Sequence, residues 1–148
     1  MKRLFIYTVM LMIALTSGAQ KVKPVQYGGM CQLHSVKDKG AGIYVIACNG
    51  YGKNDAIAKE DAEIRVIRMV LYTGIAGERN ALLREETEQL DNFVDQKQYK
   101  DYIMNITQAA PLIKDKGAKI KRGSFLVTVN VGGLDRYLRK NGLKKLGF

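Results

Sequence analysis

The sequence has little of the material that several protein classes need. A single histidine, His34, excludes multi-histidine metal centres and limits any Ser-His-Asp or Cys-His arrangement to that residue. No long apolar run follows the first twenty residues, so no transmembrane span is expected after them. Acidic side chains are scarce, with 14 Asp and Glu against 24 Lys and Arg, a formal net charge of +10. At 148 residues, 47% of them hydrophobic, the composition fits one packed domain and not a collagen-like, low-complexity or disordered chain.

The first nineteen residues have the pattern of a secretory signal peptide. Lys2 and Arg3 form a basic start, residues 4–15 are almost all apolar, and three small residues follow shortly after. Gln20 stands where a lipoprotein signal would require cysteine. We therefore expect export to the periplasm or the extracellular space without a lipid anchor. The expected boundaries are a signal peptide over 1–19, a flexible leader over 20–27 and a single domain over 28–148.

The rest of the chain alternates between strand and helix patterns. Period-two alternation and turn residues predict strands, and recurrence every three or four residues predicts helices. In chain order, the expected elements are a hairpin of strands 30–36 and 42–48, a helix over 56–72, one or two short helices covering the sheet edge within 78–102, a strand over 103–109 interrupted by Pro111, a strand over 119–131, and a helix over 134–141.

The helix over 56–72 has the clearest pattern. Its apolar stripe begins with Ala58 and Ala62, which permit close approach to a sheet, and continues with Val66 and Val70, which can fill a core. Strand 42–48 is apolar on both faces, which favours a central position in the sheet. Together these patterns predict an α+β fold, with a mostly antiparallel sheet packed against one long helix and short additional helices.

Small and apolar residues recur with a characteristic spacing in two segments. The first segment contains Gly50-Tyr51-Gly52, Ala58, Ala62, Val66, Leu71 and Gly74-Ile75. The second contains Phe125, Val127, Val129 and a short Leu134–Leu138 helix. This spacing resembles the N-terminal domain of flagellar assembly protein T and related small outer-membrane lipoproteins. The resemblance implies an exported α+β module of an envelope assembly, with no catalytic residues to carry over. The chain departs from that family in lacking the lipoprotein cysteine and a companion domain.

Gly50 and Gly52 lie between a strand and a helix, where glycine-rich loops in other proteins hold phosphates. The third glycine of a dinucleotide motif is missing, and Asp55 takes its place with a charge that would repel a pyrophosphate. We therefore predict that the two glycines form a tight structural turn, and that the protein binds no nucleotide.

Catalytic constellations are sparse. His34 is expected on the surface of a strand, and one acidic cluster is expected on a solvated helical face beside Arg84 and Lys97: Glu85, Glu86, Glu88, Asp91 and Asp95. Paired carboxylates need an enclosed cleft before they can hydrolyse a polymer. We therefore expect no catalytic site, no metal and no cofactor; a hydrolase of wall polymers is the less favoured alternative.

Basic residues gather on both sides of the last strand, and a fold that returns on itself would join them into one surface for an anionic partner. Those residues are Lys114, Lys116, Lys119, Lys121, Arg122, Arg136, Arg139, Lys140, Lys144 and Lys145. The expected function is binding, to an envelope protein or an outer-membrane assembly. The alternative is a secreted binder of an anionic polymer, either a glycan or a nucleic acid.

The two cysteines, Cys31 and Cys48, have indices that sum to 79. A hairpin centred between Lys39 and Gly40 would set them opposite each other, at a distance that a disulfide tolerates. The same register places Leu33 across from Ile46 and Ser35 across from Tyr44. Two reduced thiols buried as small core residues are the other interpretation.

Overall fold

The computed structural model describes residues 31–144. The predicted signal peptide, the leader over 20–27, the first residue of the expected strand 30–36 and Lys145 lie outside the described residues. The elements are β1 (Gln32–Asp38), β2 (Ile43–Gly52), α2 (Asp55–Tyr72), β3 (Gly74–Ile75), β4 (Arg79–Asn80), α3 (Glu88–Asp95), the 3-10 helix η1 (Gln98–Tyr102), β5 (Ile103–Ile113), β6 (Lys121–Asn130) and α4 (Val131–Lys140).

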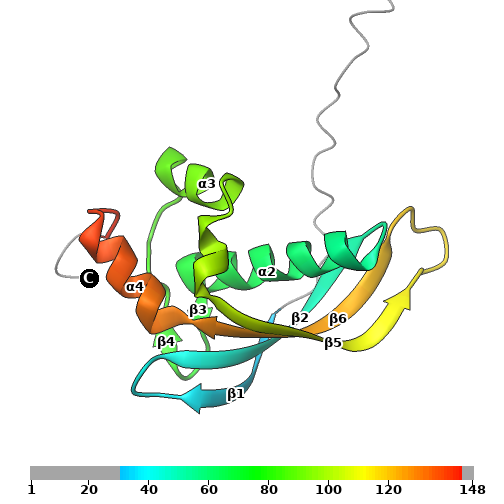
Figure 1. Ribbon diagram of the computed structural model, residues 1–148, viewed down its shortest axis with the longest axis horizontal. Coiled ribbons are helices and arrows are strands. Elements are labelled where there is room, and N and C mark those ends of the chain that lie inside the picture. Colours follow the sequence, from blue (N-terminus) through cyan, green and yellow to red (C-terminus); the bar gives the residue numbers. More distant parts are fainter. Residues whose placement is uncertain (1–30, 145–148) are drawn as a thin grey trace, which may run out of the picture.

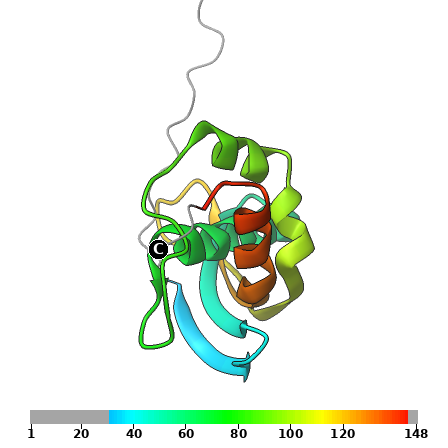
Figure 2. The same cartoon turned by 90° about the vertical axis from the view of Figure 1, so that its left-hand side faces the viewer.

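The predicted α+β class is confirmed. Four strands form an antiparallel sheet in the order β1-β2-β6-β5, and a separate two-stranded hairpin consists of β3 and β4. The helices lie on one side of the four-stranded sheet, as Figures 1 and 2 show from two directions. Strand β2 is central, as its two apolar faces predict.

The core lies between this sheet and the helices. On β2, Tyr44, Ile46 and Cys48 are buried, and on β6 the buried face includes Phe125 and Val127, while the residues between them are largely half-buried. Leu134 and Leu138 of α4 are also fully buried. None of the helices between residues 31 and 144 is both long and apolar enough to cross a bilayer.

Helix α2 begins where the sequence predicts. The Asn54 side chain accepts a hydrogen bond from the Ile57 amide at 3.0 Å, which caps the helix. Ala58 and Ala62 are completely buried against β2 in the first half, and bulky residues follow in the second. The chain leaves the helix through Gly74, whose φ of +85° is a left-handed conformation that glycine adopts readily.

Three expectations about the later elements are wrong. Pro111 does not end the strand but lies inside β5, because β5 is an edge strand and its outer side needs no hydrogen-bond donor. Gly132 and Gly133 do not precede the last helix but form its first turn, which the Asn130 side chain caps by accepting from the Gly133 amide at 2.8 Å.

The third correction concerns the short helices. Helix α3 does not cover a sheet edge. It packs over η1 and α4, because the Phe93 ring lies 6.3 Å from the Tyr102 ring and 5.4 Å from the Tyr137 ring, centroid to centroid. These aromatic contacts between three segments close the end of the core away from the β5–β6 turn.

Candidate functional site

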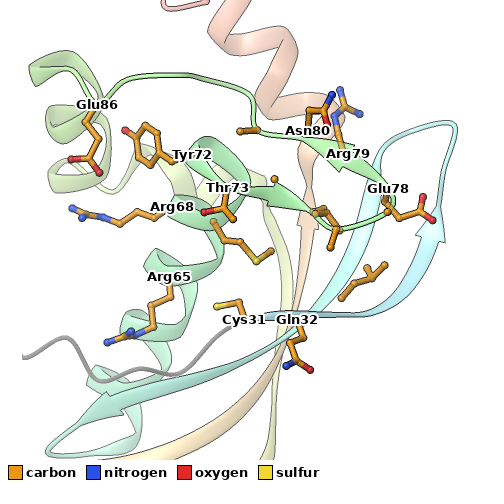
Figure 3. A pocket seen from close by; sticks show the side chains of 17 residues that line it. Cys31, Gln32, Arg65, Arg68, Tyr72, Thr73, Glu78, Arg79, Asn80 and Glu86 are labelled. Atoms are coloured by element: carbon orange, nitrogen blue, oxygen red, sulfur yellow. The ribbon is translucent and has the colours of Figure 1, made fainter.

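An open groove of about 1280 Å³ lies on the described part of the chain. Three segments enclose it: the start of β1, the second half of α2, and the β3–β4 hairpin with its flanks (Figure 3). Its lining residues are Cys31, Gln32, Leu33, Arg65, Arg68, Met69, Tyr72, Thr73, residues 74–81 and Glu86.

The hairpin wall of the groove is held to the end of α2. Gly74 cannot be replaced without moving the hairpin, because an added Cβ would lie 2.5 Å from the Arg79 carbonyl oxygen. Past the hairpin, the Leu82 amide donates to the Val70 carbonyl at 3.2 Å, and the Leu83 amide donates to the Leu71 carbonyl at 2.8 Å. The hairpin and the helix therefore form one continuous wall.

Several charged side chains of the groove are held by internal partners. Arg65 donates to Asp61 Oδ2 at 2.7 Å, and its guanidinium lies 4.9 Å from the centre of the Tyr51 ring. Glu78 pairs with Lys39 Nζ at 3.0 Å, and this bond raises the pKa of Lys39. Two charged side chains of the groove, Arg65 and Glu78, are therefore already paired within the molecule.

Arg68, Tyr72 and Glu86 lie together at the end of the groove nearer α3 (Figure 3). Partial burial and the charge of Glu86 raise the pKa of the Tyr72 hydroxyl, while Arg68 acts against them. Tyr72 is thus a neutral hydrogen-bonding group between an exposed cation and an exposed carboxylate.

Behind the hairpin, one buried carboxylate holds three cations. Asp135 of α4 pairs with Arg79 at 3.1 Å, Arg139 at 3.3 Å and Lys144 at 2.8 Å. Burial by itself would raise the pKa of Asp135, but the hydrogen bonds from Lys144 and Arg139 outweigh burial and lower it. Asp135 thereby fastens β4, and with it the groove wall, to the last helix.

A second buried polar cluster lies where η1 meets α2. Tyr99 is fully buried, and desolvation together with Glu60 and Glu63 raises the pKa of its hydroxyl to about 12. Glu63 is itself buried and lies 3.7 Å from Lys100 Nζ, and Glu60 pairs with Lys97 at 2.6 Å. These pairs attach η1 to the side of α2 and add nothing to the groove.

The two cysteines are bonded in the structure. The distance between the Sγ atoms of Cys31 and Cys48 is 2.01 Å, and their Cα atoms are 4.3 Å apart. The neighbouring register is the predicted one, with Leu33 opposite Ile46. The bond closes the start of β1 onto the central strand at the floor of the groove.

Closer to the turn, the predicted register is wrong. Ser35 lies opposite Val45 and not opposite Tyr44, because the pairing of β1 shifts after Leu33. It shifts again before the turn. Such bulges are tolerated in β1 because it is an edge strand with a single neighbour.

The two glycines of the predicted turn have a different role from the one expected. Gly50 and Gly52 lie inside β2 and have no positive φ, so no turn requires them. A Cβ on Gly50 would lie 1.9 Å from the Ala58 carbonyl oxygen, and one on Gly52 would lie 2.5 Å from the Ala58 amide nitrogen. Glycine is needed at both positions because the backbone of α2 lies directly on them.

The predicted basic surface is divided into two. Lys114, Lys116, Lys119, Lys121 and Arg122 lie at the β5–β6 turn, whereas Arg136, Arg139, Lys140 and Lys144 follow the other end of β6 (Figure 1). The eight residues of β6 that follow Arg122 separate the groups, roughly 26 Å of extended strand. In the second group, Arg139 and Lys144 are occupied by Asp135.

The remaining candidate residues are at the surface. His34 is exposed on β1, and the acidic cluster from Glu85 to Asp95 is exposed on and before α3. Within residues 31–144, no group of three or more His, Cys, Asp or Glu side chains is placed to hold a metal ion.

Sequence reasoning missed the groove and the residues that build it, notably Arg68, Tyr72, Arg79 and Asp135. Arg79 and Asp135 are 56 positions apart, and no local pattern links them. The one available signal was the Gly74-to-Gly77 stretch, where two glycines follow a helix and mark a reversal of the chain.

Comparison with known proteins gives no assignment. No family model, curated protein or solved structure matches this chain.

Proposed function

We propose that the protein is an exported, non-catalytic module of the cell envelope that binds a partner protein in the groove between β1, α2 and the β3–β4 hairpin. The occupant is an extended segment of the partner that carries apolar side chains and a carboxylate. The observation that supports this proposal is the groove itself, whose open shape and mixed lining suit a chain segment better than an enclosed small molecule.

The lining favours this kind of occupant. Leu33 and Met69 supply apolar surface, and Arg68 is an exposed cation beside them that can meet a carboxylate. Strand β1 is an edge strand, so its outer backbone groups are unpaired within the sheet and can hydrogen-bond an added strand. Its first residues line the groove, and the shifts in its register begin only after Leu33.

Export is part of the proposal. The signal-like start of the sequence supports it, and so does the bond between Cys31 and Cys48, since disulfides persist in oxidising compartments. The intact mass of the protein isolated from its native cells checks this part. A mature chain beginning at or near Gln20 is expected, and a chain that retains residues 1–19 would contradict export.

Site-specific photocrosslinking in the native envelope tests the groove. A photoreactive phenylalanine derivative is introduced at Arg68 or Thr73 in the groove and, as matched controls, at the exposed Lys59 and Lys140 outside it. We expect one partner to be crosslinked from both groove positions and from neither control. Equal labelling from all four positions, or labelling from the controls alone, would refute the groove as the binding site.

The purified partner then supplies the quantitative test. Binding of the crosslinked partner segment to the protein is expected to weaken about ten-fold or more in the variant Arg68→Glu, because a carboxylate of the segment would face a like charge. Lys59→Glu makes the same change of charge outside the groove and is expected to leave the affinity within about two-fold. Equal weakening by both variants would indicate a general charge effect and contradict the proposal.

A further inference from the structure

The end of the molecule at the β5–β6 turn has a concentrated positive charge. Five of the predicted basic residues lie there, and Lys53 joins them because Gly52 pairs with Lys121 across the sheet. The described carboxylates among these cations are Asp55 and Asp115; Asp61, which accepts from the Tyr51 amide, pairs with Arg65 and adds no net charge. Six cations against two carboxylates leave a net charge of +4.

Two large apolar side chains are exposed at the same end. Ile113 is 55% exposed and lies opposite Arg122 at the end of β5, and Ile57 is 49% exposed in the first turn of α2, next to Gly52. Ile113 is on the face of the sheet away from the helices, and Ile57 is on the helix side. Apolar side chains therefore flank the basic end on both faces.

We propose that this basic end, consisting of the β5–β6 turn, Lys53 and the two isoleucines, docks on the surface of an anionic lipid bilayer. Lysines beside exposed aliphatic side chains match the two layers of such a surface, phosphate headgroups above hydrocarbon. A surface for single-stranded nucleic acid would instead combine cations with exposed aromatic rings on which bases can stack. At this end, the ring of Tyr51 is covered by the Arg65 guanidinium.

This docking surface shares no residue with the groove, although Arg65 of the groove rim lies over Tyr51 beside it. The hairpin wall of the groove is bonded to α4 through Arg79 and Asp135, at the other end of β6 (Figure 1). The module can therefore hold a partner segment while its basic end rests on a membrane, and each proposal can fail without the other.

Vesicle co-sedimentation tests the lysines. The mature chain from Gln20 to Phe148 is mixed with vesicles of equal parts phosphatidylglycerol and phosphatidylcholine, or of phosphatidylcholine alone. We expect binding to the anionic vesicles only. Each lysine contributes about five-fold to partitioning onto such a surface, so Lys114→Gln, Lys116→Gln and Lys119→Gln together are expected to lower it about 100-fold.

The matched control removes three exposed charges elsewhere, as Lys37→Gln, Arg136→Gln and Lys140→Gln. It is expected to lower partitioning by less than about three-fold. A similar loss in both triple variants would show that only net charge matters and would overturn the docking surface. Each of the three turn substitutions made singly is expected to give its own five-fold step, which keeps the test available if a triple variant fails to fold.

Substitution of Ile113 distinguishes binding to a bilayer from binding to a soluble polyanion. Ile113→Ser is expected to lower vesicle binding about five-fold or more, whereas Met104→Ser, equally exposed at the other end of β5, is not. Neither change is expected to affect binding to a single-stranded oligonucleotide. Vesicle binding unaffected by Ile113→Ser, or oligonucleotide binding tighter than vesicle binding, would overturn the lipid assignment.

Discussion

The two halves of α2 contact the sheet in different ways. In the first half, Ala58 and Ala62 lie directly on Gly50 and Gly52 of β2, with no room for even one added carbon. In the second half, bulky buried residues fill the space between the helix and its neighbours: Val66, Ile67, Val70 and Leu71. Side-chain size alone therefore makes one half a backbone-to-backbone contact and the other an ordinary packed core.

The two candidate surfaces lie beside different halves of α2. The second half of α2 carries the groove, because the segment after the β3–β4 hairpin is hydrogen-bonded to that half and holds the hairpin beside it. In the first turns of α2, Ile57 and Lys59 are exposed, and η1 is attached farther along the helix.

The largest expected effect is in the close-packed half. Gly50→Ala would bring Cβ within 1.9 Å of a backbone oxygen, which only a shift of α2 can relieve. We expect the free energy of unfolding to fall by about 4 kcal/mol, measured by denaturant titration. Gly52→Val is expected to be disruptive for the same reason.

Gly40→Ala is the matched control for that prediction. Gly40 has no positive φ, and its Cβ would meet only a side-chain oxygen of Asp38 at 3.5 Å. Its effect is expected to be within about 0.5 kcal/mol. Similar stabilities for the Gly50 and Gly40 variants would show that α2 does not rest on β2 as described.

In the second half of α2, substitutions that remove side-chain volume are expected to lower the free energy of unfolding most. Ile67→Ala is expected to lower the free energy of unfolding by about 3 kcal/mol, since it removes a fully buried side chain and leaves a cavity. Ile67→Leu conserves volume and is expected to cost less than about 1.5 kcal/mol. If the leucine variant were as unstable as the alanine variant, the second half of α2 would tolerate changes of shape as poorly as the first, and the difference between the two halves would be contradicted.

The disulfide lies on the sheet next to the close contact with α2, since Cys48 precedes Gly50 on β2 by two residues. Removing the bond in the double variant Cys31→Ala and Cys48→Ala is expected to cost about 2 to 3 kcal/mol, because it releases a loop with a sequence separation of 17. Alkylation and mass spectrometry of unreduced protein from its native compartment check the bond directly. Two alkylated thiols there would contradict it.

The smallest of these effects concerns two carboxylates at opposite ends of the molecule, Asp135 on α4 and Asp115 at the β5–β6 turn. Asp135→Asn is expected to lower the free energy of unfolding by about 2 kcal/mol at neutral pH, because it leaves three cations without their buried partner. Asp115→Asn is the control, since the Asp115 side chain is 54% exposed and pairs only with Arg122 among the contacts described. Asp115→Asn is expected to lower the free energy of unfolding by less than about 0.5 kcal/mol.

The same carboxylate gives a dependence on pH. The folded pKa of Asp135 lies below its ordinary value of 3.8, so the unfolded chain binds this proton more readily than the folded one. Its stabilisation is present above that value and is lost as the pH falls through the lower folded pKa. Unfolding curves of the wild type and Asp135→Asn should therefore converge at acid pH; a constant difference would contradict the depressed pKa.

Local patterns in the sequence predicted most elements of the fold. The spacing of Ala58, Ala62, Val66 and Val70 indicates the buried face of α2, and alternation identifies β2 and β6 as strands of the core. They also predicted the register beside the cysteines. Each of these signals depends on residues within a few positions of one another, where backbone preference and burial act together.

Prediction failed where the outcome depended on a distant neighbour. Pro111 is acceptable in β5 only because β5 is at the edge, and the shifts in β1 are acceptable for the same reason. The basic residues divide because β6 runs without interruption between them. Whether two such groups meet is decided by the path of the chain and not by their spacing.

The sequence by itself determined the α+β class, the small-residue face of α2 and the separation of apolar from charged positions, because these depend on residue size and periodicity. Only the tertiary structure decided that Gly50 and Gly52 are contact positions, that Asp135 collects three cations and that three segments enclose a groove. Those features need residues that are far apart in the chain to come within a few ångströms, and that proximity exists only once the core has packed.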